Sequence, residues 1–422
     1  MLHKAKMLGN GLFQVAWNGL ICGVLFKGIL LFQSCFPVAY NYFVSEDSWV
    51  EYGTFVCYLL AGFLVLRAIK IDQSTRRLGY ILLCLGLFFI AMEEISWGQR
   101  LFGIRTPHII AQFNQQSELS LHNVSFFQAE HLFFYAILIW AIILPEISYR
   151  VKRFDAFLKV VGIPLVSREI YPYFILGFFL KNFEVVIQNA EIGEFFIGLA
   201  FVLFAVDTYF KTYDRIENIY RKKGQLIGWA ITVLLIATTL IVLLGPQDIY
   251  ALKWHLQKSA ITEYPRFGMN AQAQKIFEYL VRHEELKNDD TLFQYGLFLK
   301  RVNRGEAEAI FEKTLKEARE HMLKTPDKPA PNILAGKILK ELNQLELAQK
   351  EFDEALRKNQ IRLIQAELNW QKMDALKSMG ETYIEMEKYD LAREHLQKAF
   401  DYAEGGWAKA RIKDLLEAIG PQ

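Results

Sequence analysis

The sequence predicts an all-α protein in which a polytopic helical membrane domain is followed by a helical-repeat domain. Hydrophobic residues make up 52% of the 422 residues, which is high for a wholly soluble protein. The apolar residues lie in long runs that end near residue 245, and Lys, Glu, Asp, Ala and Leu dominate beyond that point. In this second part, small and bulky residues recur at fixed spacings. We therefore expect domains at 1–245 and 246–422.

Seven apolar segments of the first part are long enough to cross a bilayer, which takes about 20 helical residues. The first follows a basic start, but it is too long for a cleaved signal peptide and lacks a small-residue cleavage site, so we expect an uncleaved span. The fifth is interrupted by Lys181, Asn182 and Glu184. The expected spans are 12–36, 49–69, 77–98, 124–145, 171–188, 191–212 and 224–245.

The distribution of basic residues predicts the orientation of these spans. Lys and Arg collect at the HKAK start and in the loops 67–77, 146–170 and 211–223. Such residues accumulate on the cytoplasmic side of a membrane. Seven spans that begin inside place the second domain outside, which in a bacterium is the periplasm. We therefore expect a multi-pass protein of the bacterial inner membrane, and the side of the second domain depends on the odd number of spans.

Charge and cysteine usage limit the classes of partner. The net charge is +2, and basic and acidic residues of the second part alternate at helical spacing, so we expect no nucleic-acid partner. The four cysteines lie in or beside apolar runs without a CxxC motif and indicate no redox compartment. The segment 151–162 has basic residues on one side and apolar residues on the other, which predicts an amphipathic helix lying on membrane lipid.

The stretch from Glu93 to His131 contains groups that a membrane protein normally excludes from its spans. Glu93 and Glu94 end the third span, Arg100 follows them, and Glu130 and His131 open the fourth. If the third span stays helical, Glu93 and Arg100 share one face of it with the Trp that lies between them. The loop between the two spans is rich in amides and contains two further histidines, so we expect it to cover the site.

The fifth and sixth spans add more ionisable groups at the same expected depth. Lys181, Glu184 and Gln188 have helical spacing near the outer end of the fifth span, and Glu191 and Glu194 open the sixth. An ionised side chain in hydrocarbon costs about 2.5 to 3.5 kcal/mol on insertion scales. Several such groups at one level imply mutual pairing, a water-filled cavity, a metal or a substrate.

Carboxylates and imidazoles of this kind are suited to general acid and base catalysis. They are also ligands for a divalent metal, although neither an HExxH nor a paired ExxH motif is present. We expect Arg100, Lys181 and Glu184 to bind the substrate. A purely structural belt of ion pairs that joins four helices remains the alternative. The candidate catalytic residues are Glu93, Glu94, His122, Glu130 and His131.

The run EEISWGQRLFG, which begins at Glu93, and the later LHN at 121–123 resemble a signature of poorly characterised bacterial polytopic membrane proteins. This resemblance implies no particular activity. It adds only that the polar stretch belongs to a membrane domain.

The second part contains an internal repeat. A looser copy begins at Gly296, and the fragment at Ala273 resembles the second helix of a further one. Two closer copies have the same spacings, namely Gly336, Leu339, Ala348, Phe352 and Ala355, and Gly380, Tyr383, Ala392, Leu396 and Ala399.

This pattern resembles the tetratricopeptide repeat over roughly residues 250–420. The resemblance implies stacked helix pairs that bind a protein partner, with no catalytic residues of their own. Gly336 and Gly380 lie 44 positions apart, instead of the usual 34 or so. We therefore expect a lengthened helix over about 359–371.

Two functional hypotheses follow, and the sequence leaves open whether the protein is an enzyme. The first is a cell-envelope hydrolase or transferase that acts on a lipid-linked or envelope substrate at the outer membrane face, while the repeat domain recruits a protein partner. The second is a non-catalytic membrane-anchored scaffold, or an assembly or transport component of an envelope complex.

Overall fold

The structure is a computed structural model of the whole chain. It describes residues 2–45, 48–71, 77–99, 130–212, 219–244, 249–283, 286, 288–302, 305–403 and 406–420. These residues form helices and no strands, so the all-α prediction is confirmed for them. They divide into two compact units. By internal contacts, the first unit ends at His255 and the second resumes at Leu256, within helix α13 (Ile249–Lys258).

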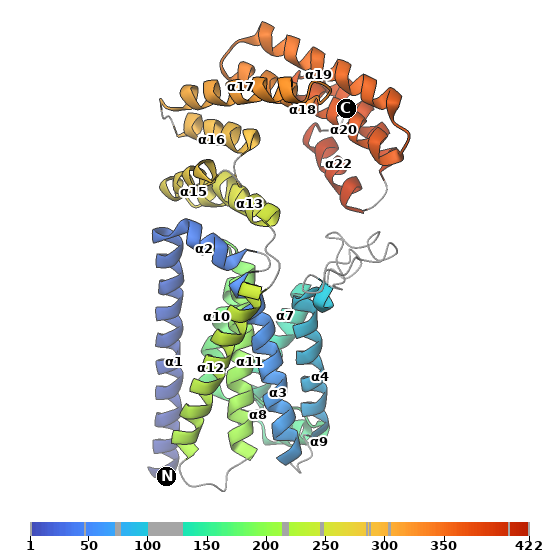
Figure 1. Cartoon of the computed structure of the whole chain (residues 1–422). Coiled ribbons are helices and arrows are strands. Elements are labelled where there is room, and N and C mark those ends of the chain that lie inside the picture. The colour runs from blue at the N-terminus through green and yellow to red at the C-terminus, as the bar shows by residue number, and fades with distance from the viewer. Residues whose placement is uncertain are drawn as a thin grey trace. The chain divides into compact units, whose positions relative to one another are not determined.

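The first unit is a bundle of long helices that run in alternating directions (Figure 1). The end of α4 lies at the same end of this bundle as the starts of α3, α7 and α11 and the end of α10. The helices are α1 (Leu2–Cys35), α2 (Pro37–Val44), α3 (Trp49–Ile71), α4 (Arg77–Glu94), α7 (Glu130–Leu138) continuing through η2 (Ile139–Ile143) into α8 (Leu144–Arg150), α9 (Lys152–Val161), α10 (Tyr171–Asn182), α11 (Asn189–Thr212) and α12 (Ile219–Leu244).

Five stretches of these helices are long and apolar enough to cross a membrane. Two of the seven predicted spans are not among them. Helix α4 contains three charged residues, and α10 has 12 residues, which make about 18 Å of helix. The five stretches are Phe13–Cys35, Trp49–Ile69, Leu132–Arg150, Asn189–Phe210 and Leu226–Leu243.

The predicted fifth span, 171–188, is helical only as far as Asn182. The side-chain amide of Asn189 donates a hydrogen bond to a carbonyl in the last turn of α10, at 2.7 Å. In the turn that follows, the backbone N–H of Ile187 donates to Oε1 of Gln33 on α1, at 3.0 Å. These polar contacts end the helix, so the expected helical face shared by its outer residues does not form.

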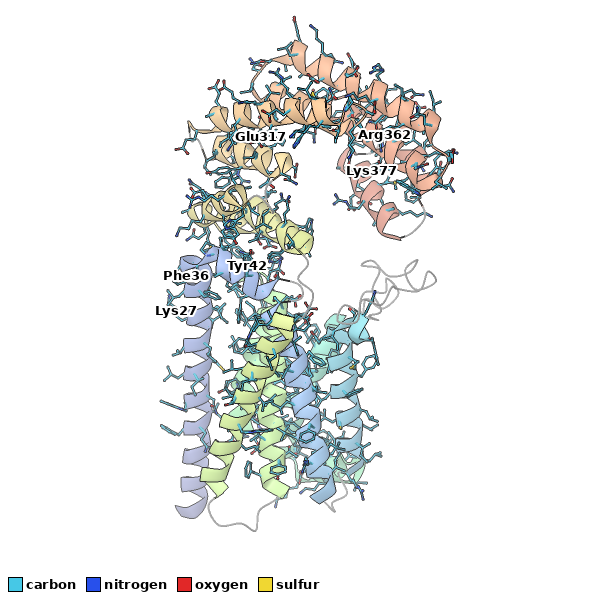
Figure 2. The ribbon with its side chains drawn as sticks, viewed as in Figure 1. Lys27, Phe36, Tyr42, Glu317, Arg362 and Lys377 are labelled. Carbon is cyan, nitrogen blue, oxygen red and sulfur yellow. The ribbon has the colours of Figure 1, made fainter. Side chains whose placement is uncertain are left out.

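Helix α1 packs against the rest of the first unit mainly along one face. On that face, Nδ2 of Asn18 donates to the carbonyl of Glu169 at 2.8 Å, and the hydroxyl of Tyr173 donates to Oδ1 of Asn18 at 3.2 Å. Cys22 is also buried there. Lys27 is exposed on the same helix (Figure 2).

The second unit is a series of helices in which each packs against its neighbours along the chain (Figure 1). After α13 come the short η4 (Ser259–Glu263) and α14 (Tyr264–Arg266). The longer helices are α15 (Asn270–Arg282), α16 (Asp289–Arg301), α17 (Ala307–Lys324), α18 (Ala330–Glu341), α19 (Leu345–Gln365), α20 (Asn369–Glu385), α21 (Tyr389–Tyr402) and α22 (Gly406–Ala418).

Three successive helix pairs of the second unit share one contact. A Cβ on the glycine of the first helix of each pair would lie 2.5 to 2.6 Å from a bulky side chain of the second helix. Only glycine therefore allows this close approach. The three contacts are Gly296 with Phe311, Gly336 with Phe352, and Gly380 with Leu396.

The lengthened helix expected over about 359–371 is present only in part, because it does not continue to 371. Helix α19 has 21 residues and ends at Gln365, and α20 has 17 residues and begins at Asn369. The additional residues therefore lengthen two helices, and a break over 366–368 separates them. A capping contact supports this break, because Oε1 of Gln371 accepts the backbone N–H of Leu368 at 3.0 Å.

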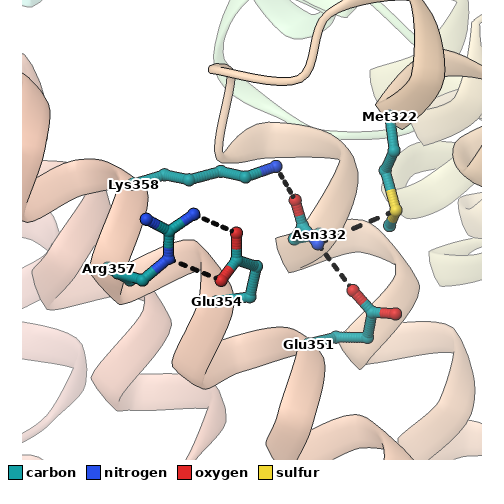
Figure 3. Close-up of polar contacts among 6 residues, drawn as sticks. All are labelled: Met322, Asn332, Glu351, Glu354, Arg357 and Lys358. Carbon is teal, nitrogen blue, oxygen red and sulfur yellow. Dashed lines mark hydrogen bonds and ion pairs between the residues drawn. The ribbon is translucent and has the colours of Figure 1, made fainter.

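A polar contact joins α17, α18 and α19 in the interior of the second unit (Figure 3). Asn332 of α18 is 4% exposed, and its Oδ1 accepts a hydrogen bond from Nζ of the buried Lys358 at 2.7 Å. Its Nδ2 donates to Oε2 of Glu351 at 2.6 Å and lies 3.7 Å from the sulfur of Met322. One amide thus satisfies a cation and an anion, which limits the cost of burying them.

Candidate functional site

The end of α4 contains two adjacent carboxylates with different surroundings. Glu93 is 8% exposed, and its Oε1 accepts a hydrogen bond from Nε1 of Trp97 at 2.5 Å. Glu94 is partly exposed. Neighbouring helical residues point about 100° apart, so the two carboxylates face different parts of the protein.

The chain after α4 makes a tight left-handed turn. Ser96, Trp97 and Gly98 have φ values of 46°, 55° and 78°. Left-handed backbone costs an ordinary residue about 1 to 2 kcal/mol, so the first two residues are strained. The helix of the third predicted span therefore ends at Glu94 and does not continue to residue 98, and Arg100, which was expected on the same helical face as Glu93, lies outside the described residues. The turn itself brings Trp97 back to Glu93.

A buried ion pair joins α10 to α11. Nζ of Lys181 pairs with Oε1 of Glu194, and the two side chains are only 9% and 16% exposed. The same ammonium lies 5.0 Å from the centre of the Phe134 ring on α7, within the range of a cation–π contact. Residues from three helices therefore meet at Lys181.

Two glycines place this ion pair by letting α10 and α11 approach backbone to backbone. A Cβ on Gly193 would lie 2.5 Å from the backbone nitrogen of Lys181, and one on Gly177 would lie 2.9 Å from the carbonyl oxygen of Gly193. Any larger residue would push the helices apart. Glu194 follows Gly193 directly, so the closest approach of the two helices is also the place of the pair.

Glu94 belongs to a group that we call the acidic cluster. Its charge interacts with those of Glu51 on α3, Glu191 and Glu194 on α11, and Lys181 on α10. The cluster thus contains four carboxylates and one ammonium, all at one end of the first unit. Such an excess of carboxylates in a partly buried place is balanced by bound protons or by a bound cation.

Glu94 differs from the other carboxylates described here in its partners. Glu93 accepts a hydrogen bond from Trp97, and Glu194 forms an ion pair with Lys181. Within the described part of the chain, Glu94 has no hydrogen bond or ion pair, and its interactions are the longer-range ones of the cluster. Its carboxylate therefore remains available to another group.

The structure brings together some of the residues that the sequence singled out. The charges of Lys181 and Glu94 lie close enough to interact, whereas Glu184 lies exposed in the turn after α10 and is not among the charges that act on Glu94. Glu51 was missed, although an acidic residue near the start of an apolar run at the expected outer end is a visible signal. Arg100 and His122 lie outside the described residues, and for Glu130 and His131 only the helical backbone at the start of α7 is described.

The metal hypothesis draws no support from the described residues. Among them, no three His, Cys, Asp or Glu side chains converge as ligands for a metal ion. The other proposed ligands, His122, Glu130 and His131, have side chains outside that set, so a divalent metal stays a prediction from the sequence.

The first unit thus has the helices of a polytopic membrane protein with a charged cluster at one end. No family model, curated protein or solved structure matches the chain.

Proposed function

We propose that the protein is an enzyme of the bacterial inner membrane, a hydrolase or transferase whose general acid or base is Glu94. The observation that carries the proposal is the contrast in partners described above. Glu93 accepts a hydrogen bond and Glu194 forms an ion pair. Glu94 interacts with the charges of the acidic cluster but has no hydrogen bond or ion pair among the described residues. A carboxyl group in such a place can take up and release a proton during a reaction.

Lys181 and its pairing with Glu194 have a positioning role in this proposal. The pair holds α10 against α11 beside Glu94, and its ammonium contributes the cluster's one positive charge. The substrate class follows from location. A polar site at one end of membrane-spanning helices is accessible to lipid headgroups, so we propose a lipid-linked or other envelope substrate at the outer face.

The second unit is proposed to recruit a protein partner. The support is its repeated Gly-to-bulky contact, which stacks helix pairs as tetratricopeptide repeats do, together with exposed apolar residues where α19 meets α20. Ile364, Leu368 and Trp370 are 75%, 54% and 58% exposed there. Large exposed apolar side chains that lie together are typical of protein-binding surfaces.

The enzyme proposal is tested by Glu94→Gln, with Glu308→Gln as the control because Glu308 is an exposed carboxylate on α17 of the second unit. Each variant replaces the natural protein in cells, and purified protein is incubated with membrane lipids and lipid-linked sugars that are followed by mass spectrometry. We expect Glu94→Gln to lose product formation and cellular function by about 100-fold or more, while Glu308→Gln retains both. Full function of Glu94→Gln at normal protein level would refute the role of Glu94.

The alternative is a non-catalytic scaffold, and one observation favours it. The Lys181–Glu194 pair and the Phe134 contact join three helices, as a structural belt would. In that case Lys181→Met would reduce the amount of folded protein, and Glu94→Gln would leave the cellular phenotype normal.

A further inference from the structure

Helix α1 presents most of its membrane-spanning surface to the outside of the first unit. Within an 18-residue stretch of its span Phe13–Cys35, only 6% of the residues are buried, whereas the share is 72% in the Trp49–Ile69 span of α3. Lipid chains can cover such a surface where it is apolar. They cannot solvate a charged group on it.

Lys27 is a charged group of this kind. It is exposed, and among the described residues it has neither a hydrogen bond nor an ion pair. It lies 8 residues before Cys35 and 14 after Phe13, which correspond to about 12 Å and about 21 Å of helix. Its ammonium is therefore well inside the span.

The direction of the side chain makes escape to water difficult. A helical side chain leans toward the N-terminus of its helix. The nearer end of the span is the C-terminal one, at Cys35, so Lys27 leans away from the closer water layer. A long Lys near a helix end can reach the interface, but here the depth and the lean both oppose this.

The surroundings of Lys27 on α1 allow another helix to approach. Gly23 and Leu31 lie four residues to either side and so on the same face. A Cβ on Gly19, Gly23 or Gly28 would meet nothing within 4 Å. Small residues of this kind let the backbones of two membrane helices come close, so that polar side chains bond between them.

We propose that this face of α1, defined by Gly19, Gly23, Lys27 and Leu31, is a docking surface for a membrane-spanning helix of another protein that carries an Asp or Glu at the depth of Lys27. Charge decides between the candidate occupants. A second copy of this chain would bring two Lys27 ammonium groups together across a symmetric contact, which is repulsive. Lipid alone leaves the ammonium unpaired.

The proposal is tested with the full chain in phosphatidylcholine vesicles and a synthetic Leu/Ala membrane-spanning helix. The helix has one Glu at the depth of Lys27 or, as its control, one Gln. A photo-crosslinking amino acid in place of Leu31 reports binding. We expect about fivefold more cross-linking to the Glu helix at low helix concentration. Lys27→Met removes the preference, and Lys27→Glu transfers it to a Lys-containing helix.

Val24→Met is the matched control, because Val24 is 64% exposed on the same helix. It keeps the preference if the charge is responsible. Equal cross-linking of the Glu and Gln helices, a preference that survives Lys27→Met, or cross-linking mainly to a second copy of the chain would each overturn the proposal. Lys27→Met makes the span more apolar, so it is not expected to prevent insertion.

Discussion

At the scale of single residues, glycines decide which helices can meet. Gly177 and Gly193 allow α10 and α11 to come together at the Lys181–Glu194 pair, and Gly336 allows the same kind of approach in the second unit. The missing side chain is what matters at these positions, because backbone atoms or rigid rings occupy the place of a Cβ. The geometry of the candidate site therefore depends on residues with no functional group.

We expect Gly193→Ala to destabilise the first unit by about 1 to 3 kcal/mol, because the new Cβ would overlap the backbone of Lys181. The measurement is the midpoint of thermal unfolding of the full chain in detergent, followed by helical circular dichroism. Gly86→Ala is the matched control, since a Cβ there meets nothing within 4 Å. Its midpoint should stay the same or rise slightly, because Ala favours helix over Gly. Equal effects of the two changes would contradict this account.

At the scale of helices, buried polar contacts determine where elements end and which neighbours they take. The amide of Asn189 ends α10, and the hydroxyl of Tyr40 donates to the carbonyl of Ile187 in the following turn at 2.6 Å. In the second unit, Asn332 joins α18 to α19 through Lys358 and Glu351. Such contacts add little net energy when complete, and their loss is costly because the partners stay buried.

Asn332→Ala should therefore cost about 2 to 3 kcal/mol, mainly because the buried ammonium of Lys358 loses its acceptor. We expect faster amide hydrogen exchange in α18 and α19 of the full chain, with little change in the first unit. Gln349→Ala, which removes an exposed contact with Asp353 on α19, serves as the control and should leave exchange nearly unchanged. Unaltered exchange in Asn332→Ala would show that the contact is dispensable.

At the scale of the whole molecule, the number of crossings determines which side of the membrane the second unit occupies. The five apolar stretches and the seven predicted spans are both odd numbers, so each gives the same side for a chain that begins inside. A reporter enzyme that works only in the periplasm, fused after Gln422, should therefore be active. The same reporter placed after Arg215, in a predicted cytoplasmic loop, should be inactive. The reverse pattern would overturn the orientation.

The sequence predicts much of this architecture because the relevant signals are local. Apolar runs locate the membrane helices, and the glycine and bulky positions of the repeat, such as Gly336 and Phe352, are the positions that meet in the structure. Small residues recur where two helices pack closely, so their spacing in the sequence predicts which positions of the repeat are in contact.

What the sequence did not predict depends on contacts between distant segments. The segment 171–188 has helical spacing throughout, yet α10 ends early because Gln33, far away in sequence, bonds the turn that follows. Glu51 joins the acidic cluster only because α3 packs beside α11. The turn at Ser96 and Trp97 could not be predicted either, because neither residue type favours left-handed backbone.

The nearest-neighbour packing of the second unit has a consequence for the order of events during synthesis. Its glycine contacts join residues 15 or 16 positions apart, so each helix pair can close as soon as its own residues have emerged. In the first unit, Asn18 finds its partner on Glu169, 151 residues later. The face of α1 that contains Asn18 therefore stays uncovered in the membrane until most of the first unit has been synthesised. Lys27 is also exposed during that time.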